Sequence, residues 1–183
     1  MQTKEKRIYE YISEIRDAKA DGSLKVGDMY LTKDSEGEAL FEIADIRKKK
    51  IFLCRKYLLK DRPMNGLMEY LNGEYYNSLE GELKEAIVER KGQKIFLPRE
   101  VEVFGDYIYS EDTEKGKQWE LFKNVKKRIK CHSKDDECSD WWWLSSPLVC
   151  DATHFCVVYT SGAATSYGAS HSSGVAPCFL IGV

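Results

Sequence analysis

Serine, histidine and aspartate residues occur close together near the end of the chain, and these residue types can carry out nucleophilic catalysis. His154 and His171 lie near Ser170 and Asp151 in the sequence, so a triad can be drawn on paper. However, no nucleophile elbow precedes Ser170, and serine is the commonest residue of this segment, which makes a chance match easy. We therefore expect no enzymatic activity and no catalytic residues.

Metal binding is the second chemistry that the residue types suggest. The Cys131-His132 pair and Cys138 have a spacing that fits no ordinary zinc module. Calcium needs several oxygen ligands, and the last 39 residues offer one carboxylate, that of Asp151. We expect no metal and no cofactor, and free thiols at all six cysteines, positions 54, 131, 138, 150, 156 and 178.

The segment 145–183 differs in composition from the rest of the chain. It carries one of the 58 charged side chains, whereas a stretch of this length ordinarily holds roughly ten. It also lacks Lys, Glu, Gln, Met and Trp, the residue types that no codon ending in a pyrimidine encodes. Tyr- and Ser-rich composition of this kind is typical of binding loops. A buried sheet with Ser/Thr/Gly-rich turns is the alternative interpretation.

The whole chain sets limits on partners and location. It has 183 residues, enough for one substantial core, and a net charge of -2 with mixed signs, which argues against nucleic-acid binding. The basic run 123–130 is interpreted as a solvated amphipathic segment. The N-terminus has no signal peptide and no stretch is long enough to span a membrane, so we expect cytoplasmic synthesis and no membrane insertion. Association with a virion or a surface stays open.

Hydrophobic spacing predicts the elements. The pattern indicates an amphipathic helix over residues 4–19, then a hairpin of runs 40–46 and 51–59 with a charged tip at 47–50, preceded by an extended segment at 29–32. Two helices are predicted over 66–72 and 78–89, the first ended by Asn72-Gly73 and the second capped by Ser78. A short strand is predicted at 94–97, and 99–140 is predicted to be mostly loop, with a short helix near 119–125.

Two closing motifs are the most specific signals: DWWWLSSP at 140–147 and GVAPCFLI at 174–181. The apolar block of the first should anchor a strand in the core, and Val175, Pro177, Phe179 and Ile181 alternate like a half-buried strand. Together with LMEYLNGEYYNSL at 67–79 and KIFLPREVEV at 94–103, the chain resembles the formylglycine-generating-enzyme-like branch of the C-type lectin fold. It is similar in particular to bacterial and phage variable proteins of diversity-generating retroelements.

The resemblance implies an α+β, C-type lectin-like fold over residues 25–183, with small antiparallel sheets, two or three helices and long loops. The amphipathic helix within 1–24 would pack on this body. The resemblance also implies a non-enzymatic protein whose hypervariable region, about 145–183, binds a variable protein or surface ligand. The cysteines do not match the copper oxidase that names the branch. The alternative is a static structural or enzyme-associated module of bacterial or phage origin.

Within the variable region we divide positions by expected role. Small or apolar residues are expected to form scaffold, and these are Phe155, Cys156, Val158, Gly162, Ala164, Ala169 and Ser172. The positions expected to be displayed to a ligand are Leu148, Val149, Asp151, His154, Val157, Tyr159, Thr160, Ala163, Thr165, Ser166, Tyr167, Gly168, Ser170, His171 and Ser173.

Overall fold

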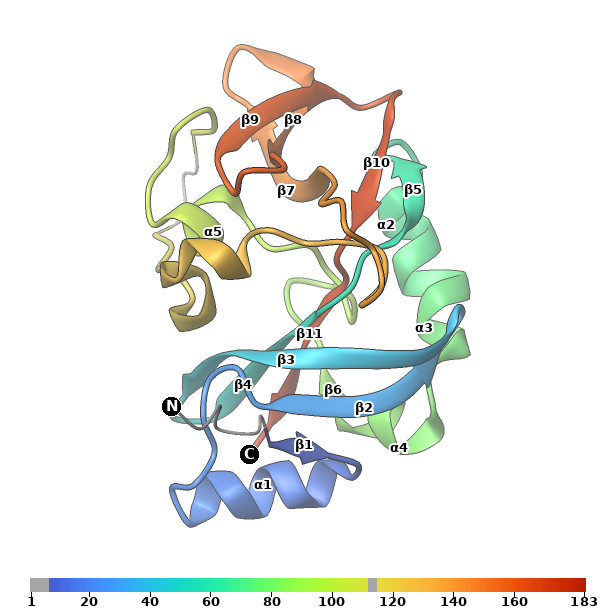
Figure 1. Ribbon diagram of the computed structural model, residues 1–183, viewed down its shortest axis with the longest axis vertical. Coiled ribbons are helices and arrows are strands. Elements are labelled where there is room, and N and C mark those ends of the chain that lie inside the picture. The colour runs from blue at the N-terminus through green and yellow to red at the C-terminus, as the bar shows by residue number, and fades with distance from the viewer. Residues whose placement is uncertain (1–6, 112–114) are drawn as a thin grey trace.

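Two mixed β-sheets dominate the computed structural model, which describes residues 7–111 and 115–183 (Figure 1). The first sheet has the strand order β1-β2-β3-β4-β11-β6, and the second has the order β5-β10-β7-β8-β9. The strands of the first sheet are β1 (Ile8–Tyr9), β2 (Met29–Asp34), β3 (Gly37–Arg47), β4 (Lys50–Arg55), β11 (Cys178–Gly182) and β6 (Ile87–Val88). Those of the second are β5 (Leu59–Pro63), β10 (Ser172–Val175), β7 (Trp142–Leu148), β8 (Asp151–Val158) and β9 (Ala164–Gly168).

The helices are short and lie around the sheets. The longest, α1, has nine residues and none in the described part is long and apolar enough to cross a bilayer. The helices are α1 (Ile12–Ala20), α2 (Leu67–Tyr70), the π-helix η1 (Leu71–Tyr75), α3 (Tyr76–Ser78), α4 (Gly81–Ala86), α5 (Glu100–Phe104) and the 3₁₀ helices η2 (Glu120–Lys123) and η3 (Val125–Lys127).

The predicted C-type lectin-like α+β fold is wrong. Strand makes up 38% and helix 22%, and the eleven strands of the described chain form two mixed sheets. Neither sheet is purely antiparallel, because β1 pairs in parallel with β2 and β10 pairs in parallel with β7. The reason lies in segments expected to be helical or irregular, which instead contribute short strands such as β1, β5 and β6.

The predicted hairpin of runs 40–46 and 51–59 forms, but its second strand is shorter than predicted, because β4 ends at Arg55 and Leu59 begins β5 in the second sheet. Strands β3 and β4 pair antiparallel around the charged tip, with Arg47 opposite Lys50, and β2 pairs antiparallel with β3. Most apolar residues of these runs are buried, as the β-branched and aromatic composition leads one to expect, and Leu40, Ile46 and Tyr57 are half-buried. This part of the chain therefore follows its local pattern.

The N-terminal helix is shorter than predicted. Residues 4–6 of the predicted helix lie outside the described part, and Ile8–Tyr9 forms β1 beside β2. The Tyr9 hydroxyl donates a hydrogen bond of 3.1 Å to Asp28, which fixes this strand. Helix α1 then packs its buried residues Ile12, Ile15 and Ala18 on the body.

The two predicted helices at 66–89 have different boundaries in the structure. Helical turns continue from α2 through η1 and α3 without a break at Asn72-Gly73. The Asn72 side chain accepts hydrogen bonds from the backbone N–H groups of Lys94 and Ile95, at 2.8 and 3.0 Å, so a distant segment uses this residue instead of a helix stop. Ser78 does not cap the second helix, since α4 starts at Gly81 with Glu80 as its N-cap. Residues 94–97 form only a bridge, Phe96 to Cys178.

Two hydrophobic clusters make up the core, and single strands contribute to both. In β7 the side chain of Trp143 belongs to one cluster and those of Trp142 and Leu144 to the other, because successive residues of a strand point to opposite faces. Residues 173–181 are buried throughout, so the predicted half-buried strand is instead two strands, β10 and β11, that are buried except at their outer ends, Ser172 and Gly182. The closing motifs therefore tie both sheets together.

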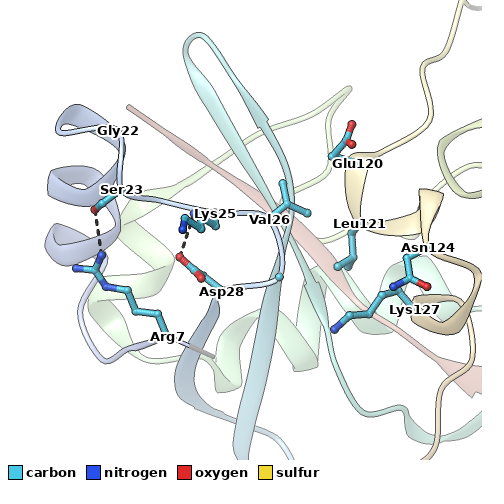
Figure 2. A pocket seen from close by; sticks show the side chains of 11 residues that line it. Arg7, Gly22, Ser23, Lys25, Val26, Asp28, Glu120, Leu121, Asn124 and Lys127 are labelled. Atoms are coloured by element: carbon cyan, nitrogen blue, oxygen red, sulfur yellow. Dashed lines mark hydrogen bonds between the residues drawn. The ribbon is translucent and has the colours of Figure 1, made fainter. Parts of the chain in front are cut away.

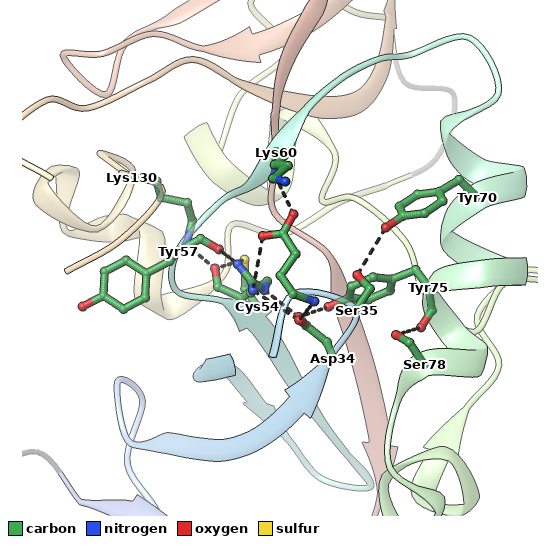
Figure 3. A network of polar contacts seen from close by, with 11 residues as sticks. Asp34, Ser35, Cys54, Tyr57, Lys60, Tyr70, Tyr75, Ser78 and Lys130 are labelled. Carbon is green, nitrogen blue, oxygen red and sulfur yellow. Dashed lines mark hydrogen bonds and ion pairs between the residues drawn. The ribbon is translucent and has the colours of Figure 1, made fainter. Parts of the chain in front are cut away.

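A buried polar network fixes the point where the chain leaves the first sheet for the second (Figure 3). The Arg55 guanidinium donates to the Asp34 carboxylate at 2.8 Å, and the Tyr75 hydroxyl donates to the same carboxylate at 2.8 Å. Burial, followed by the charge of Asp34, raises the pKa of Tyr75 well above its ordinary value. The Lys130 ammonium donates to the carbonyls of Arg55 and Lys56 at 2.6 and 3.2 Å. Loop, strand and helix are thereby held around the β4–β5 connection.

Candidate functional site

The charge-poor segment forms most of the second sheet, including its edge strand β9, and it supplies β11 to the first sheet. Strand β7 pairs antiparallel with β8, and β8 with the edge strand β9, so that Phe155 lies opposite Tyr167. Trp143 and Val157 are paired across β7 and β8 and are both fully buried. The inner part of this unit therefore packs as core, while its edge and its turns reach the surface.

A row of aromatic side chains runs along this edge, and we call it the aromatic shelf: Trp141, Tyr159, Tyr167 and His171. The Trp141 ring meets Tyr159 and Tyr167 edge-on, with centroids 4.9 and 5.2 Å apart. The His171 ring stacks on Tyr167 at 4.7 Å. Tyr159 is 41% exposed, and Trp141 and Tyr167 are half-buried. Rings held in this way offer rigid contact area at low entropic cost.

A small hollow of about 200 Å³ opens beside the shelf. Its walls are Asp140, Trp141, Tyr167, Ser172 and Ser173. The Ser173 hydroxyl is buried and has no hydrogen-bond partner among the described residues. The hollow thus combines two aromatic faces with a carboxylate and two hydroxyls, a mixture suited to a polar side chain of a ligand.

A second exposed surface lies at the β7–β8 turn, and we call it the turn groove: residues 107–111 and 148–150. It is a depression of about 560 Å³. Large apolar side chains line it in the open, among them Ile108 at 51% and Val149 at 53% exposure. The Val149 N–H donates to the Tyr109 carbonyl at 3.1 Å, which joins its two walls. Such grouped apolar exposure is typical of interaction sites.

The loop wall of the turn groove is held by a buried carboxylate. Glu100, in α5, is fully buried and accepts hydrogen bonds from the N–H groups of Ile108, Tyr109 and Ser110 at 3.1, 3.0 and 2.9 Å. The Ser110 hydroxyl donates to it at 2.6 Å. Burial, and then the nearby Glu100, raises the pKa of the Cys156 thiol to about 12. Helix α5 thus positions a surface loop from within the core.

Of the Ser-His-Asp triad considered from the sequence, only a histidine and the aspartate are in contact. His154 Nδ1 lies 2.7 Å from Asp151 Oδ2, and hydrogen bonds from Thr153, followed by the contact with His154, lower the pKa of Asp151. Within the described residues, no hydrogen bond joins Ser170 to His154 or His171. The pair therefore stands as an ion pair or hydrogen bond at the surface, without an activated nucleophile.

The expected display positions divide by burial. Val157 and Ser173 are buried, at 0% and 3% exposure, so these two do not lie on the open surface. Ser172, which we expected to be scaffold, is exposed. The remaining display positions are exposed or half-buried, and they are Leu148, Val149, Asp151, His154, Tyr159, Thr160, Ala163, Thr165, Ser166, Tyr167, Gly168, Ser170 and His171.

The sequence alone did not predict several residues that lie beside the displayed positions. Asp140 and Trp141 precede the variable region, and the turn groove takes one wall from 107–111. The Tyr107-Ile108-Tyr109 run, three large side chains within a loop, was the signal that could have indicated an exposed apolar patch.

One group of side chains could hold a metal ion. Ligand atoms of Asp61, His132 and Asp140 lie within 4.8 Å of one another, with His132 Nε2 at 3.4 Å from Asp61 and 3.3 Å from Asp140. Burial and then the charge of Asp140 raise the pKa of Asp61, and His132 acts in the opposite direction. All three lie at the surface beside the hollow, where an imidazole between two carboxylates is also an ordinary polar contact.

A larger cavity, of about 860 Å³, lies elsewhere, between the 22–28 turn and η2 (Figure 2). Two hydrogen bonds join parts of its wall. Arg7 donates to Ser23 at 3.0 Å, and the N–H of Lys25 donates to Asp28 at 3.0 Å. None of its lining residues comes from 145–183. We therefore place the candidate site on the aromatic shelf, the hollow and the turn groove.

The chain matches one known protein family. The family described as "Domain of unknown function (DUF6273)" matches residues 49–183, and the chain belongs to this family. The matched range begins at the β3–β4 tip and contains the whole second sheet, and therefore the aromatic shelf and the turn groove. No curated protein and no solved structure matches the chain.

Proposed function

We propose that this protein is a non-enzymatic binding protein that contacts a protein or surface ligand through the aromatic shelf and the turn groove. The observation that carries the proposal is the distribution of the charge-poor segment 145–183 over the fold. Its alternate residues hold the core, while its turns and edge strand leave aromatic and small polar side chains open. This division is what a binding surface on a stable scaffold requires.

Affinity at such a surface would come from aromatic anchors. Tyr159, Tyr167 and Trp141 are already in contact with one another, so little side-chain entropy is lost on binding. The segment contributes one charged side chain, Asp151, and binding should depend weakly on salt. A large loss of affinity between low and high salt would argue against this mode.

We further propose that the displayed positions are diversified by a retroelement. The residue alphabet of 145–183 supports this, since it contains no type that a pyrimidine-ending codon cannot encode. The burial of Val157 and Ser173 limits the freely variable set to the positions on the open face. Asp140 and Trp141 precede the segment and would stay constant beside a changing surface.

The test is the DNA around the 3′ end of the gene. We expect a nearby imperfect copy of the codons for 145–183, differing only where the copy has adenine, with a reverse transcriptase gene beside it. Differences confined to codons of the exposed positions would support both parts of the proposal. A single unrepeated locus would overturn diversification and favour a static module of the same fold.

Binding itself needs a separate test. Candidate ligands can be captured from the surface proteins of the source cells by the wild-type protein and, in parallel, by a Tyr159→Ala/Val149→Ser variant. We expect a ligand that the wild type retains and the variant loses, while a Lys134→Gln control retains it. Equal retention by all three proteins would show that this face does not bind the captured ligand.

A further inference from the structure

A further concave site shares no lining residue with the aromatic shelf or the turn groove. It is a pocket of about 380 Å³ between the β3–β4 tip, the start of α5 and the segment 115–117. Phe52, Leu180, Glu102 and Gly116 form part of its lining. The rest is cationic: Arg47, Lys50, Arg90, Arg99, Lys115 and Lys117.

Two of these arginines are held in place by the aromatic floor. The guanidinium of Arg47 lies 4.5 Å from the centre of the Phe52 ring, and that of Arg90 lies 5.8 Å from Phe52 and 4.6 Å from Phe96. Contacts of this kind hold a guanidinium by its face and direct its N–H groups sideways. Both terminal nitrogens of Arg90 donate to Glu102, so among these two groups the unshared donors at the cavity belong to Arg47.

Carboxylates neutralise part of this charge. Glu102 is 3% exposed and lies 2.6 Å from Arg90 and 3.4 Å from Arg99, while Asp45 lies 2.8 Å from Arg47. Lys50, Lys115 and Lys117 are exposed and make no ion pair with a carboxylate in the part of the chain that the structure describes. The rim of the pocket thus carries positive charge that its floor does not compensate.

The approach of the 115–117 segment depends on a glycine. A Cβ atom on Gly116 would lie 2.2 Å from Val101 Cγ1 and 3.3 Å from the Arg99 guanidinium. The backbone can pack this closely against α5 only because the side chain is absent. Lys115 and Lys117 flank this contact, so the close approach brings both ammonium groups to the pocket.

We propose that this pocket binds a small oxyanion carrying two linked phosphate groups. Fixed guanidinium groups suit phosphate oxygens, and mobile lysines at the rim can close over them as point charges. The chain as a whole has a net charge of -2, so the excess of positive charge at this pocket is not a property of the whole chain. A single pocket of about 380 Å³ fits a compact anion, whereas an extended nucleic acid needs a basic stripe. The inference is independent of the proposed ligand-binding face.

The experiment is isothermal titration of the full chain with inorganic pyrophosphate at low ionic strength. We expect saturable binding at one site that weakens as salt is added. A Lys50→Gln/Lys117→Gln variant should bind more weakly, by about fivefold for each exposed lysine removed. Adenosine diphosphate serves as a second probe. If it binds more tightly than pyrophosphate, the ligand class is a nucleoside diphosphate; if the two bind equally, the ligand class is inorganic.

The matched control removes the same charge outside the pocket. Lys49→Gln lies on the same hairpin tip, next to Lys50, and should bind pyrophosphate like the wild type. Gly116→Ala gives a second check, because displacing segment 115–117 should weaken binding even though all six cations remain. No saturable binding, or equal loss in the Lys49 and the Lys50/Lys117 variants, would overturn the proposal.

Discussion

The indole ring of Trp141 lies edge-on against the phenol ring of Tyr167, with the two centroids 5.2 Å apart. The contact joins a residue that precedes the charge-poor segment to one in its edge strand β9. Trp141 therefore supports the half-buried Tyr167 ring from a position outside the proposed variable region.

This arrangement predicts unequal tolerance of substitution. Tyr159→Ala, at an exposed turn, should change the free energy of unfolding by less than about 1 kcal/mol. Val157→Ala removes buried methyl groups beside Trp143 and should cost roughly 2 kcal/mol. Urea denaturation of both variants measures the difference. If the two cost the same, the division of 145–183 into core and display positions is incorrect.

The buried network predicts a strong dependence on Asp34. The Tyr75→Phe substitution removes the hydrogen bond from the tyrosine hydroxyl to Asp34 and leaves the one from Arg55. It should lower the free energy of unfolding by about 1–2 kcal/mol, the usual effect of losing one buried hydrogen bond. Asp34→Asn removes the buried countercharge of the Arg55 guanidinium, leaves only the Glu36 carboxylate at 3.9 Å, and should cost about 3 kcal/mol. Unfolding midpoints from circular dichroism rank the two. As a control, Tyr70→Phe removes a hydroxyl whose hydrogen bond with Ser35 lies at the surface.

Alkaline pH should destabilise the fold through Tyr9. Burial, followed by the charge of Asp28 and the hydrogen bond to it, raises the pKa of Tyr9 to about 12, whereas the unfolded chain loses this proton near pH 10. The contribution to stability is complete below pH 10 and is lost as the pH rises toward 12. Urea unfolding at pH 9 and pH 11 should show a smaller loss in Tyr9→Phe than in the wild type. An equal loss would assign the effect to other groups, such as Tyr30.

Local sequence patterns predicted elements that form from one continuous segment of the chain. The β3–β4 hairpin follows from two β-rich runs around a charged tip, and the burial of Ile12 and Ile15 in α1 follows from helical spacing. The failures arise where distant segments override local signals. Asn72-Gly73 reads as a helix stop, yet residues 94–95 bind the Asn72 side chain and the helical turns continue.

The sequence predicted only part of the candidate site, because the rest depends on contacts between distant segments. Composition indicated segment 145–183, and its turns and edge strand are open to solvent. The contribution of 107–111 could not be read from the chain, because it depends on Glu100 being buried beneath that loop. A buried carboxylate has no sequence signature when its partners are backbone N–H groups. The lectin-like fold was wrong because motifs at the strand ends do not determine how two sheets are ordered.

Five of the six cysteines should react with thiol reagents in two groups, and the half-buried Cys131 should react at a rate between them. Cys138 and Cys150 are exposed, whereas Cys54, Cys156 and Cys178 are buried. Burial raises the pKa of Cys156 to about 12 and that of Cys178 well above its ordinary value, and the thiolate is the reactive form. At pH 8 we expect rapid labelling of the exposed pair and labelling of the buried three only as fast as the protein opens. Mass spectrometry of partly labelled protein identifies the sites, and a Cys138→Ser/Cys150→Ser variant should lose the fast phase. Rapid labelling of Cys156 in the native protein would contradict the packing of β8 against the Glu100 loop.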